Sequence, residues 1–123
     1  MLTTQEIFTK VRNHLLSQNM KSRKYDHVND EPMCMYRNGA GMMCAVGCLI
    51  TDAAYDVSLE GVGAHEPEVS QMLINSGIDM NDENTANLVC SLQLMHDNTD
   101  VNKWSARLID IAGSYGLIVE GSK

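Results

Sequence analysis

The chain lacks clear signals of a nucleotide-binding protein, a membrane protein or a secreted protein. Its glycines at positions 39, 41 and 47 resemble a phosphate loop only weakly, because no Lys-Ser or Lys-Thr follows them. No apolar run reaches the roughly 18 residues of a membrane helix. The N-terminus lacks the basic and apolar regions of a signal peptide. We therefore expect a cytoplasmic protein that neither spans nor binds a membrane.

Basic residues are scarce beyond position 37. Residues 1–37 hold six Lys or Arg against four Asp or Glu, whereas residues 38–123 hold three against twelve, which accounts for the net charge of −7. A surface with this balance repels a nucleic-acid backbone and attracts a basic protein surface. The candidate partner-binding residues are the acids that bracket one expected helix, namely Asp79, Asp82, Glu83, Asp97 and Asp100.

A chain of 123 residues with 44% hydrophobic content has the size of one domain, spanning residues 1–123. We expect an α+β domain that is mainly helical, with about four to five helices and one short β-hairpin. A capping box at Thr3 and Glu6 predicts a helix over residues 4–18, and residues 19–32 are expected to be a loop. Three further helices are predicted by apolar periodicity around residues 69–74, 88–95 and 104–112, and residues 117–120 suggest a last strand.

The hairpin is predicted around the Asn38-Gly39 turn signal. One strand would cover residues 33–37, and a short returning strand would lie near 41–43. The run that follows is ambiguous between strand and helix, and we favour a buried helix that begins near Cys44. Gly47 would then allow close crossing by another helix.

Three of the four cysteines lie within fifteen residues, at positions 34, 44 and 48. A helix that begins at Cys44 would stabilise a thiolate, and His96 would be the general base of a cysteine hydrolase or transferase. Asp97 is adjacent to His96 on a helix and so is poorly placed to orient the imidazole. The alternative is that Cys44, Cys48 and Cys90 are small buried apolar residues, and this is the interpretation that we favour.

A zinc site is a further alternative. It would use Cys34, Cys44 and Cys48, with a fourth ligand from His65, Cys90 or His96. Structural zinc sites have closely spaced ligand pairs at both ends, and this chain has only one such pair. We expect neither a metal nor another cofactor.

If the cysteines carry no chemistry, the segment around them is expected to be the centre of the core. The N-terminal helix would pack on it through Phe8, Val11 and Leu15, and the last two helices through Leu92, Trp104 and Leu108. The residues that form this central segment would be Cys44, Val46, Cys48, Leu49 and Ile50.

Several short strings resemble a family of small uncharacterised proteins of bacteriophages and prophages. The specific strings are Cys34-Met-Tyr36-Arg37 and Cys44-Ala-Val-Gly-Cys-Leu-Ile50, and Tyr55, Glu60-Gly61, Leu92-Gln93, His96-Asp97 and Trp104 also match. The resemblance implies a phage-encoded protein that works inside an infected bacterium. By analogy it implies an interaction protein that binds and inhibits or redirects a host protein or a defence complex.

Overall fold

The computed structural model describes residues 2–19, 23–26, 31–34, 36–37, 42–60, 62 and 66–119, with the backbone alone for 23–26 and 31–34. The elements in chain order are helix α1 (Thr4–Gln18), strands β1 (Arg23–Asp26) and β2 (Glu31–Cys34), 3-10 turns η1 (Gly47–Leu49) and η2 (Val57–Leu59), helices α2 (Pro67–Asn75) and α3 (Glu83–Asn98), 3-10 turn η3 (Val101–Lys103), and helix α4 (Trp104–Tyr115).

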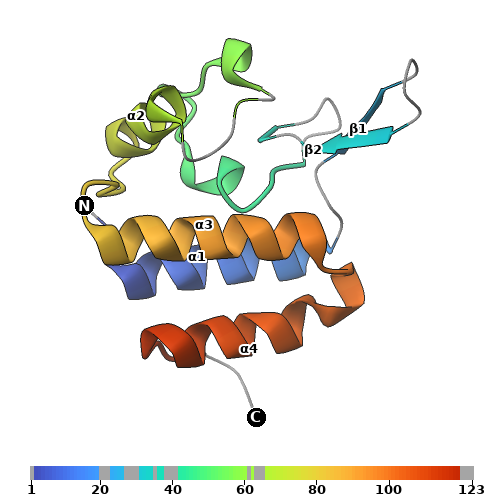
Figure 1. Ribbon diagram of the computed structural model, residues 1–123, viewed down its shortest axis with the longest axis vertical. Coiled ribbons are helices and arrows are strands. Elements are labelled where there is room, and N and C mark those ends of the chain that lie inside the picture. The colour runs from blue at the N-terminus through green and yellow to red at the C-terminus, as the bar shows by residue number, and fades with distance from the viewer. Residues whose placement is uncertain are drawn as a thin grey trace.

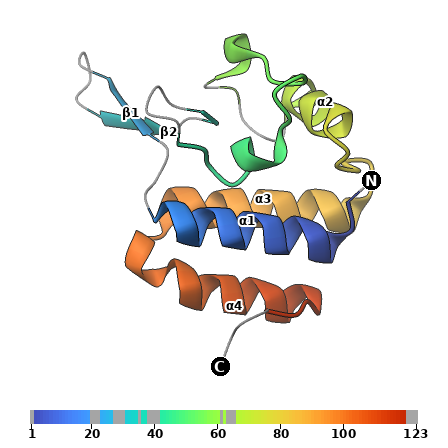
Figure 2. The same ribbon diagram turned by 180° about the vertical axis from the view of Figure 1, so that it is seen from behind.

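The helices form a layered arrangement. Helices α1 and α3 lie side by side, with α4 packed along one side of the pair. Helix α2 and the segment that carries η1 and η2 lie on the opposite side, and the β1–β2 ribbon extends to one end (Figures 1 and 2). The centre of the molecule is therefore bounded by helices on both sides.

Several helix ends lie at residues that the sequence marks as helix starts or stops. Thr3 caps α1 through a capping box with Glu6, and the helix ends where Asn19 takes a left-handed conformation at φ 53°. Pro67 occupies the first turn of α2, and Gly116 ends α4 at φ 67°. The four helices predicted over residues 4–18 and around 69–74, 88–95 and 104–112 are thus confirmed.

The α+β prediction is wrong, because the domain is helical. Four α-helices carry the described core, and the described residues from 36 to 119 contain no strand. The two four-residue strands pair antiparallel at the edge of the molecule, within a segment for which a loop was predicted up to residue 32. A single pair of strands has no face to bury against another sheet, so it cannot define the architecture. The expected terminal strand is also absent from residues 117–119.

The predicted hairpin across residues 33–43 is wrong as well. Its two sides meet only in an isolated bridge between Arg37 and Met43, and its Asn38-Gly39 turn lies outside the described residues. The predicted helix at Cys44 is replaced by the three-residue turn η1, which begins at Gly47. A Cβ atom at Gly47 would lie 1.9 Å from the Tyr36 carbonyl oxygen, so the close crossing is made by the backbone at Tyr36 and not by a helix.

The prediction of a central cysteine segment is confirmed. Every residue from Cys44 to Ile50 is buried, and α1 packs on η1. The other core residues that the sequence predicted for the three helices are also buried, namely Phe8, Val11, Leu15, Leu92, Trp104 and Leu108.

Candidate functional site

The Cys44 thiol is buried and held in its neutral form. Its side chain is 1% exposed, and Sγ accepts a hydrogen bond from the Gly47 amide at 3.3 Å. Burial raises the pKa of this thiol, the hydrogen bond from the Gly47 amide partly offsets that rise, and the nearby charge of Asp97 adds a smaller increase. Cys44 also precedes a 3-10 turn of three residues, which provides no helix dipole comparable to that of a full helix. The thiolate that catalysis needs is therefore disfavoured.

Cys48 resembles Cys44 in burial and in charge state. Its side chain is 7% exposed, and burial raises the pKa of the thiol to about 12, with Lys10 opposing the rise. The thiol donates a hydrogen bond to the Ala45 carbonyl at 3.1 Å. Both cysteines thus have the environment of small apolar core residues.

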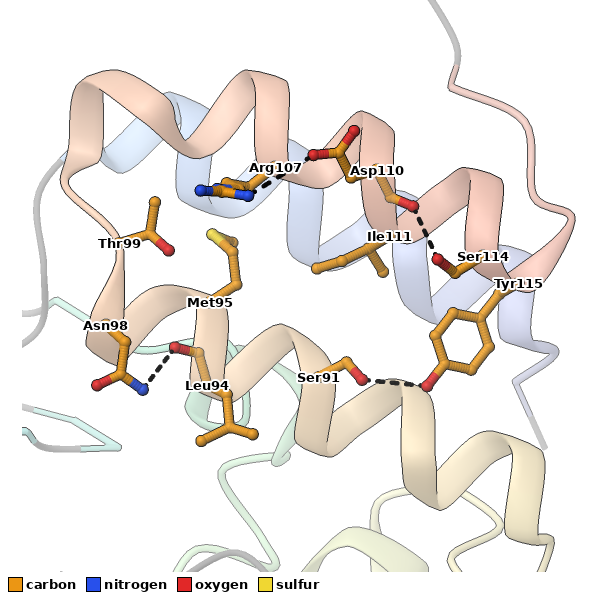
Figure 3. A pocket seen from close by; sticks show the side chains of 10 residues that line it. All are labelled: Ser91, Leu94, Met95, Asn98, Thr99, Arg107, Asp110, Ile111, Ser114 and Tyr115. Atoms are coloured by element: carbon orange, nitrogen blue, oxygen red, sulfur yellow. Dashed lines mark hydrogen bonds and ion pairs between the residues drawn. The ribbon is translucent and has the colours of Figure 1, made fainter.

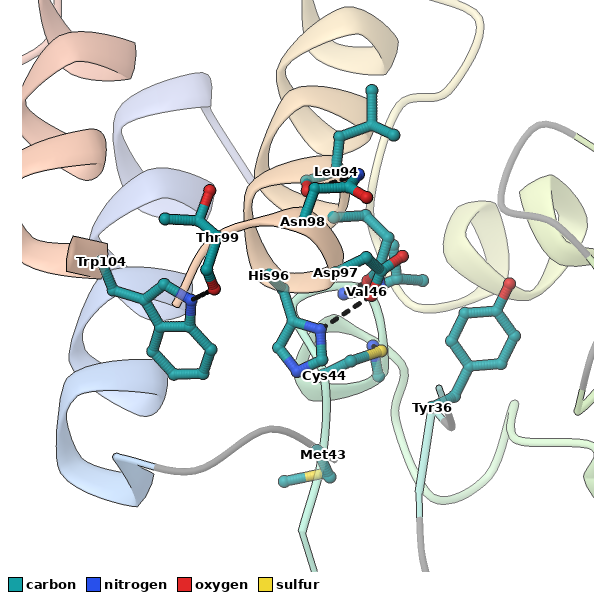
Figure 4. A network of polar contacts seen from close by, with 12 residues as sticks. Tyr36, Met43, Cys44, Val46, Leu94, His96, Asp97, Asn98, Thr99 and Trp104 are labelled. Atoms are coloured by element: carbon teal, nitrogen blue, oxygen red, sulfur yellow. Dashed lines mark hydrogen bonds and ion pairs between the residues drawn. The ribbon is translucent and has the colours of Figure 1, made fainter. Parts of the chain in front are cut away.

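A buried polar chain connects α3 to the cysteine segment (Figure 4). His96 is 0% exposed and stacks on Trp104 with 5.4 Å between ring centroids. Its Nδ1 lies 2.9 Å from Asp97 Oδ1, and the Gln93 amide donates to the same oxygen at 2.9 Å. Gln93 Oε1 in turn accepts from the Val46 amide at 2.9 Å. Because a carboxylate only accepts, Nδ1 of the imidazole carries the proton.

Asp97 does contact His96, although helical spacing predicted that the two side chains diverge. The contact is possible because Nδ1 is the ring nitrogen nearer to the backbone. The structure thus combines an imidazole with a carboxylate that can orient it. With the thiol and imidazole both buried, the geometry supports a structural role better than catalysis, and reactivity at Cys44 and His96 stays a prediction.

The described residues contain no group of three His, Cys, Asp or Glu side chains that could hold a metal ion. Cys44 and Cys48 are two of the candidate zinc ligands, and both are buried in the core. Of the other candidates, Cys90 is partly exposed and His96 is buried, whereas Cys34 and His65 lie outside the described side chains.

The five predicted acidic residues lie at the two ends of α3. Asp79, Asp82 and Glu83 are at its N-terminal end, with Asp97 and Asp100 at the other. A 16-residue helix is about 24 Å long, so these acids do not form one patch. Asp82 accepts hydrogen bonds from the Thr85 amide and hydroxyl and thereby caps the helix. Asp79 accepts a hydrogen bond from the Asn81 amide and Asp97 belongs to the His96 chain, which leaves Glu83 and Asp100 as the exposed members that make no side-chain hydrogen bond in the described part of the chain.

These acids belong to a longer acidic stretch. Residues 51–100 contain ten Asp or Glu and no Lys or Arg. The stretch includes η2, α2 and α3, and Figure 1 shows η2 and α2 on the side of the α1–α3 pair opposite α4. Three of its exposed acids make no side-chain hydrogen bond or ion pair within the described part of the chain, namely Glu68, Glu83 and Asp100.

Sequence reasoning missed a cluster around Arg37 and Glu60. The Glu60 carboxylate accepts from the backbone amides of Tyr36 at 2.8 Å and Arg37 at 3.0 Å, and from the Tyr55 hydroxyl. The Arg37 guanidinium lies 4.4 Å from the Tyr55 ring centroid and pairs with Asp52 at 2.8 Å. The only sequence signal was that four of these residues occur in the family-like strings, which gave no spatial grouping.

Comparison of the chain with protein-family models, with curated proteins and with solved structures finds no match. In the part of the chain that the structure describes, no helix combines the length and the apolar character needed to cross a bilayer.

Proposed function

We propose that this protein is an acidic interaction protein that binds a basic surface on a host protein and so inhibits or redirects that protein or its defence complex. The observation that carries the proposal is the stretch of fifty residues, 51–100, with ten acids and no basic residue. The phage setting comes from the family resemblance.

The distribution of charge suits fast association with a basic partner. Acids that flank η2 and acids on α2 and α3 act together on a partner at a distance, because no lysine or arginine within the stretch compensates them. Among them, Glu68, Glu83 and Asp100 are the best candidates for direct contact, since they are exposed and have no capping or network role. Asp82 and Asp97 contribute charge but are held by their own hydrogen bonds.

Thiol catalysis is less well supported. A nucleophilic cysteine needs a lowered pKa and access to substrate, whereas burial raises the pKa of Cys44 and leaves it 1% exposed. The His96 chain joins α3 to the cysteine segment at Val46, and this structural role explains it without catalysis.

The test uses two triple variants of equal net charge. One neutralises the candidate contacts with Glu68→Gln, Glu83→Gln and Asp100→Asn. The control adds three lysines at exposed sites outside the stretch, Asn13→Lys, Ser17→Lys and Ala106→Lys. Each variant changes the net charge of −7 by +3, to −4.

Wild-type protein is immobilised to capture partners from bacterial lysate at low and high salt, and the dissociation constant of the purified partner is then measured for each variant. We expect salt-sensitive binding that the neutralised variant weakens by about tenfold, while the control binds within about threefold of wild type. Equal effects of the two variants, or binding that is insensitive to salt, contradict the proposal.

A further inference from the structure

A groove of about 720 Å³ runs between α3 and α4 (Figure 3). Met95 from α3 and Ile111 from α4 point into the space between the helices and form its floor. Tyr115 closes one end through a hydrogen bond of 3.0 Å between its hydroxyl and that of Ser91. The groove is therefore a built feature, apolar at its base and hydrogen-bonded at its end.

One apolar side chain protrudes beside this hollow. Leu94 lines the groove on α3 and is 60% exposed, whereas its helix neighbour Met95 is 6% exposed. An exposed leucine next to an apolar hollow forms a self-complementary pair of features, because two copies related by a two-fold axis place each protrusion in the hollow of the other. Such a contact would build a four-helix arrangement from two α3–α4 pairs.

The charges of the groove are also self-complementary. Arg107 and Asp110 are the charged residues that line it, and they lie 3.9 Å apart with most of each side chain exposed. A two-fold axis that passes between Arg107 and Asp110 would bring Arg107 of one copy opposite Asp110 of the other. The groove lining carries no net charge in a chain of net charge −7, although its α3 residues belong to the stretch 51–100, so the lining itself adds no like-charge repulsion between two copies.

We infer that this groove is the interface of a symmetric homodimer, with Leu94 of each copy seated in the groove of its partner. A basic partner protein would instead be drawn to the acidic stretch, since the groove offers it no excess of negative charge. The lining residues cover about two turns, or roughly 10 Å, of each helix. The dimer therefore belongs to the weak end of specific interfaces, and it forms at about 10 to 100 µM protein.

The mass of the full chain is measured by sedimentation equilibrium from about 1 µM to about 500 µM, a range chosen to bracket a weak dimer. Wild type is expected to change from monomer to dimer across this range. Leu94→Asp is expected to raise the dissociation constant at least about tenfold. The control Val57→Asp adds the same charge at a residue that is 71% exposed and lies on η2, outside the groove, and it is expected to dimerise like wild type.

Charge reversal supplies an independent check. Arg107→Asp and Asp110→Arg are each expected to weaken the dimer about threefold or more, and the double swap is expected to restore it, because the pairing across the axis is recovered. Circular dichroism establishes that each variant is folded. A wild-type monomer at every concentration, a dimer that Leu94→Asp leaves unchanged, or a double swap that is as weak as the single reversals would overturn the inference.

Discussion

Gly47 and Cys48 are adjacent residues of η1 that are held by different constraints. Gly47 is fixed by the Tyr36 carbonyl, which occupies the space of any side chain at this position. Cys48 is fixed by burial and by the hydrogen bond from its thiol to the Ala45 carbonyl. At this scale the family-like string Cys44 to Ile50 is explained by packing, since each of its members has a place in the core.

Replacing Gly47 by alanine is expected to lower the free energy of unfolding by about 3 kcal/mol. The physical reason is that the new Cβ would lie 1.9 Å from a backbone oxygen, so the Tyr36 backbone has to move. The measurement is urea denaturation followed by circular dichroism.

The matched control is Gly113→Ala in α4, where a Cβ has no neighbour within 4 Å. There alanine is expected to raise the stability by about 0.5 to 1 kcal/mol through its helix propensity. A Gly47→Ala variant as stable as wild type would show that the Tyr36 backbone does not cross at this point.

At the scale of elements, the Glu60 carboxylate joins Tyr36 and Arg37 to the turn η2. Glu60 follows η2 directly and accepts hydrogen bonds from three donors, two of which are backbone amides. Paired buried donors of this kind are costly to leave unsatisfied, so a single acid holds two chain segments together. The polar chain from His96 through Gln93 likewise joins α3 to Val46, the residue before η1.

Glu60→Gln is expected to lower the free energy of unfolding by about 2 to 3 kcal/mol. Glutamine keeps the size of the side chain but has only one acceptor oxygen. Its NH₂ group would therefore face one of the N–H or O–H donors that Glu60 accepts from. Glu68→Gln is the control, because Glu68 is exposed and should change the stability by less than about 0.5 kcal/mol. Similar melting curves for the two variants would refute the role assigned to Glu60.

On the scale of the whole molecule, buried thiols determine how the stability responds to alkaline pH. Cys48 has an ordinary pKa of 9.0 when unfolded, and burial raises it to about 12 in the folded chain. Between these values the unfolded chain has released the proton and the folded chain has not. Stability therefore is at its full value below about pH 9 and falls as the pH rises toward 12. Cys44 acts in the same direction, since burial raises the pKa of its thiol too.

Cys48→Ala removes one of these groups. We expect the alanine variant to lose about 1 to 2 kcal/mol less stability than wild type between about pH 8 and about pH 10.5. The measurement is the free energy of unfolding in urea at the two pH values. The control is Cys90→Ala, which removes a partly exposed thiol. Its free energy of unfolding should decrease between the two pH values by as much as that of wild type. A parallel fall for the Cys48 variant would mean that this thiol titrates as it does in the unfolded chain.

The helices and much of the core could be predicted from the sequence, because both depend on local chemistry. Thr3 with Glu6, Pro67, and Gly116 mark helix ends through their own backbone preferences, and the apolar period selects the buried face. The burial of the cysteine segment followed from the same pattern. The concentration of negative charge beyond residue 37 is likewise a property of composition, which no fold can alter.

Only the tertiary structure decided how distant segments meet. The run from Met42 to Ile50 has no decisive period, and the helix that we favoured from Cys44 is not formed there, where the Tyr36 backbone crosses Gly47. The Glu60 cluster, the contact of Asp97 with His96, and the groove between α3 and α4 join residues whose relative positions depend on packing angles. Sequence determines which residues are able to make such contacts, whereas the packing of helices determines which contacts are made.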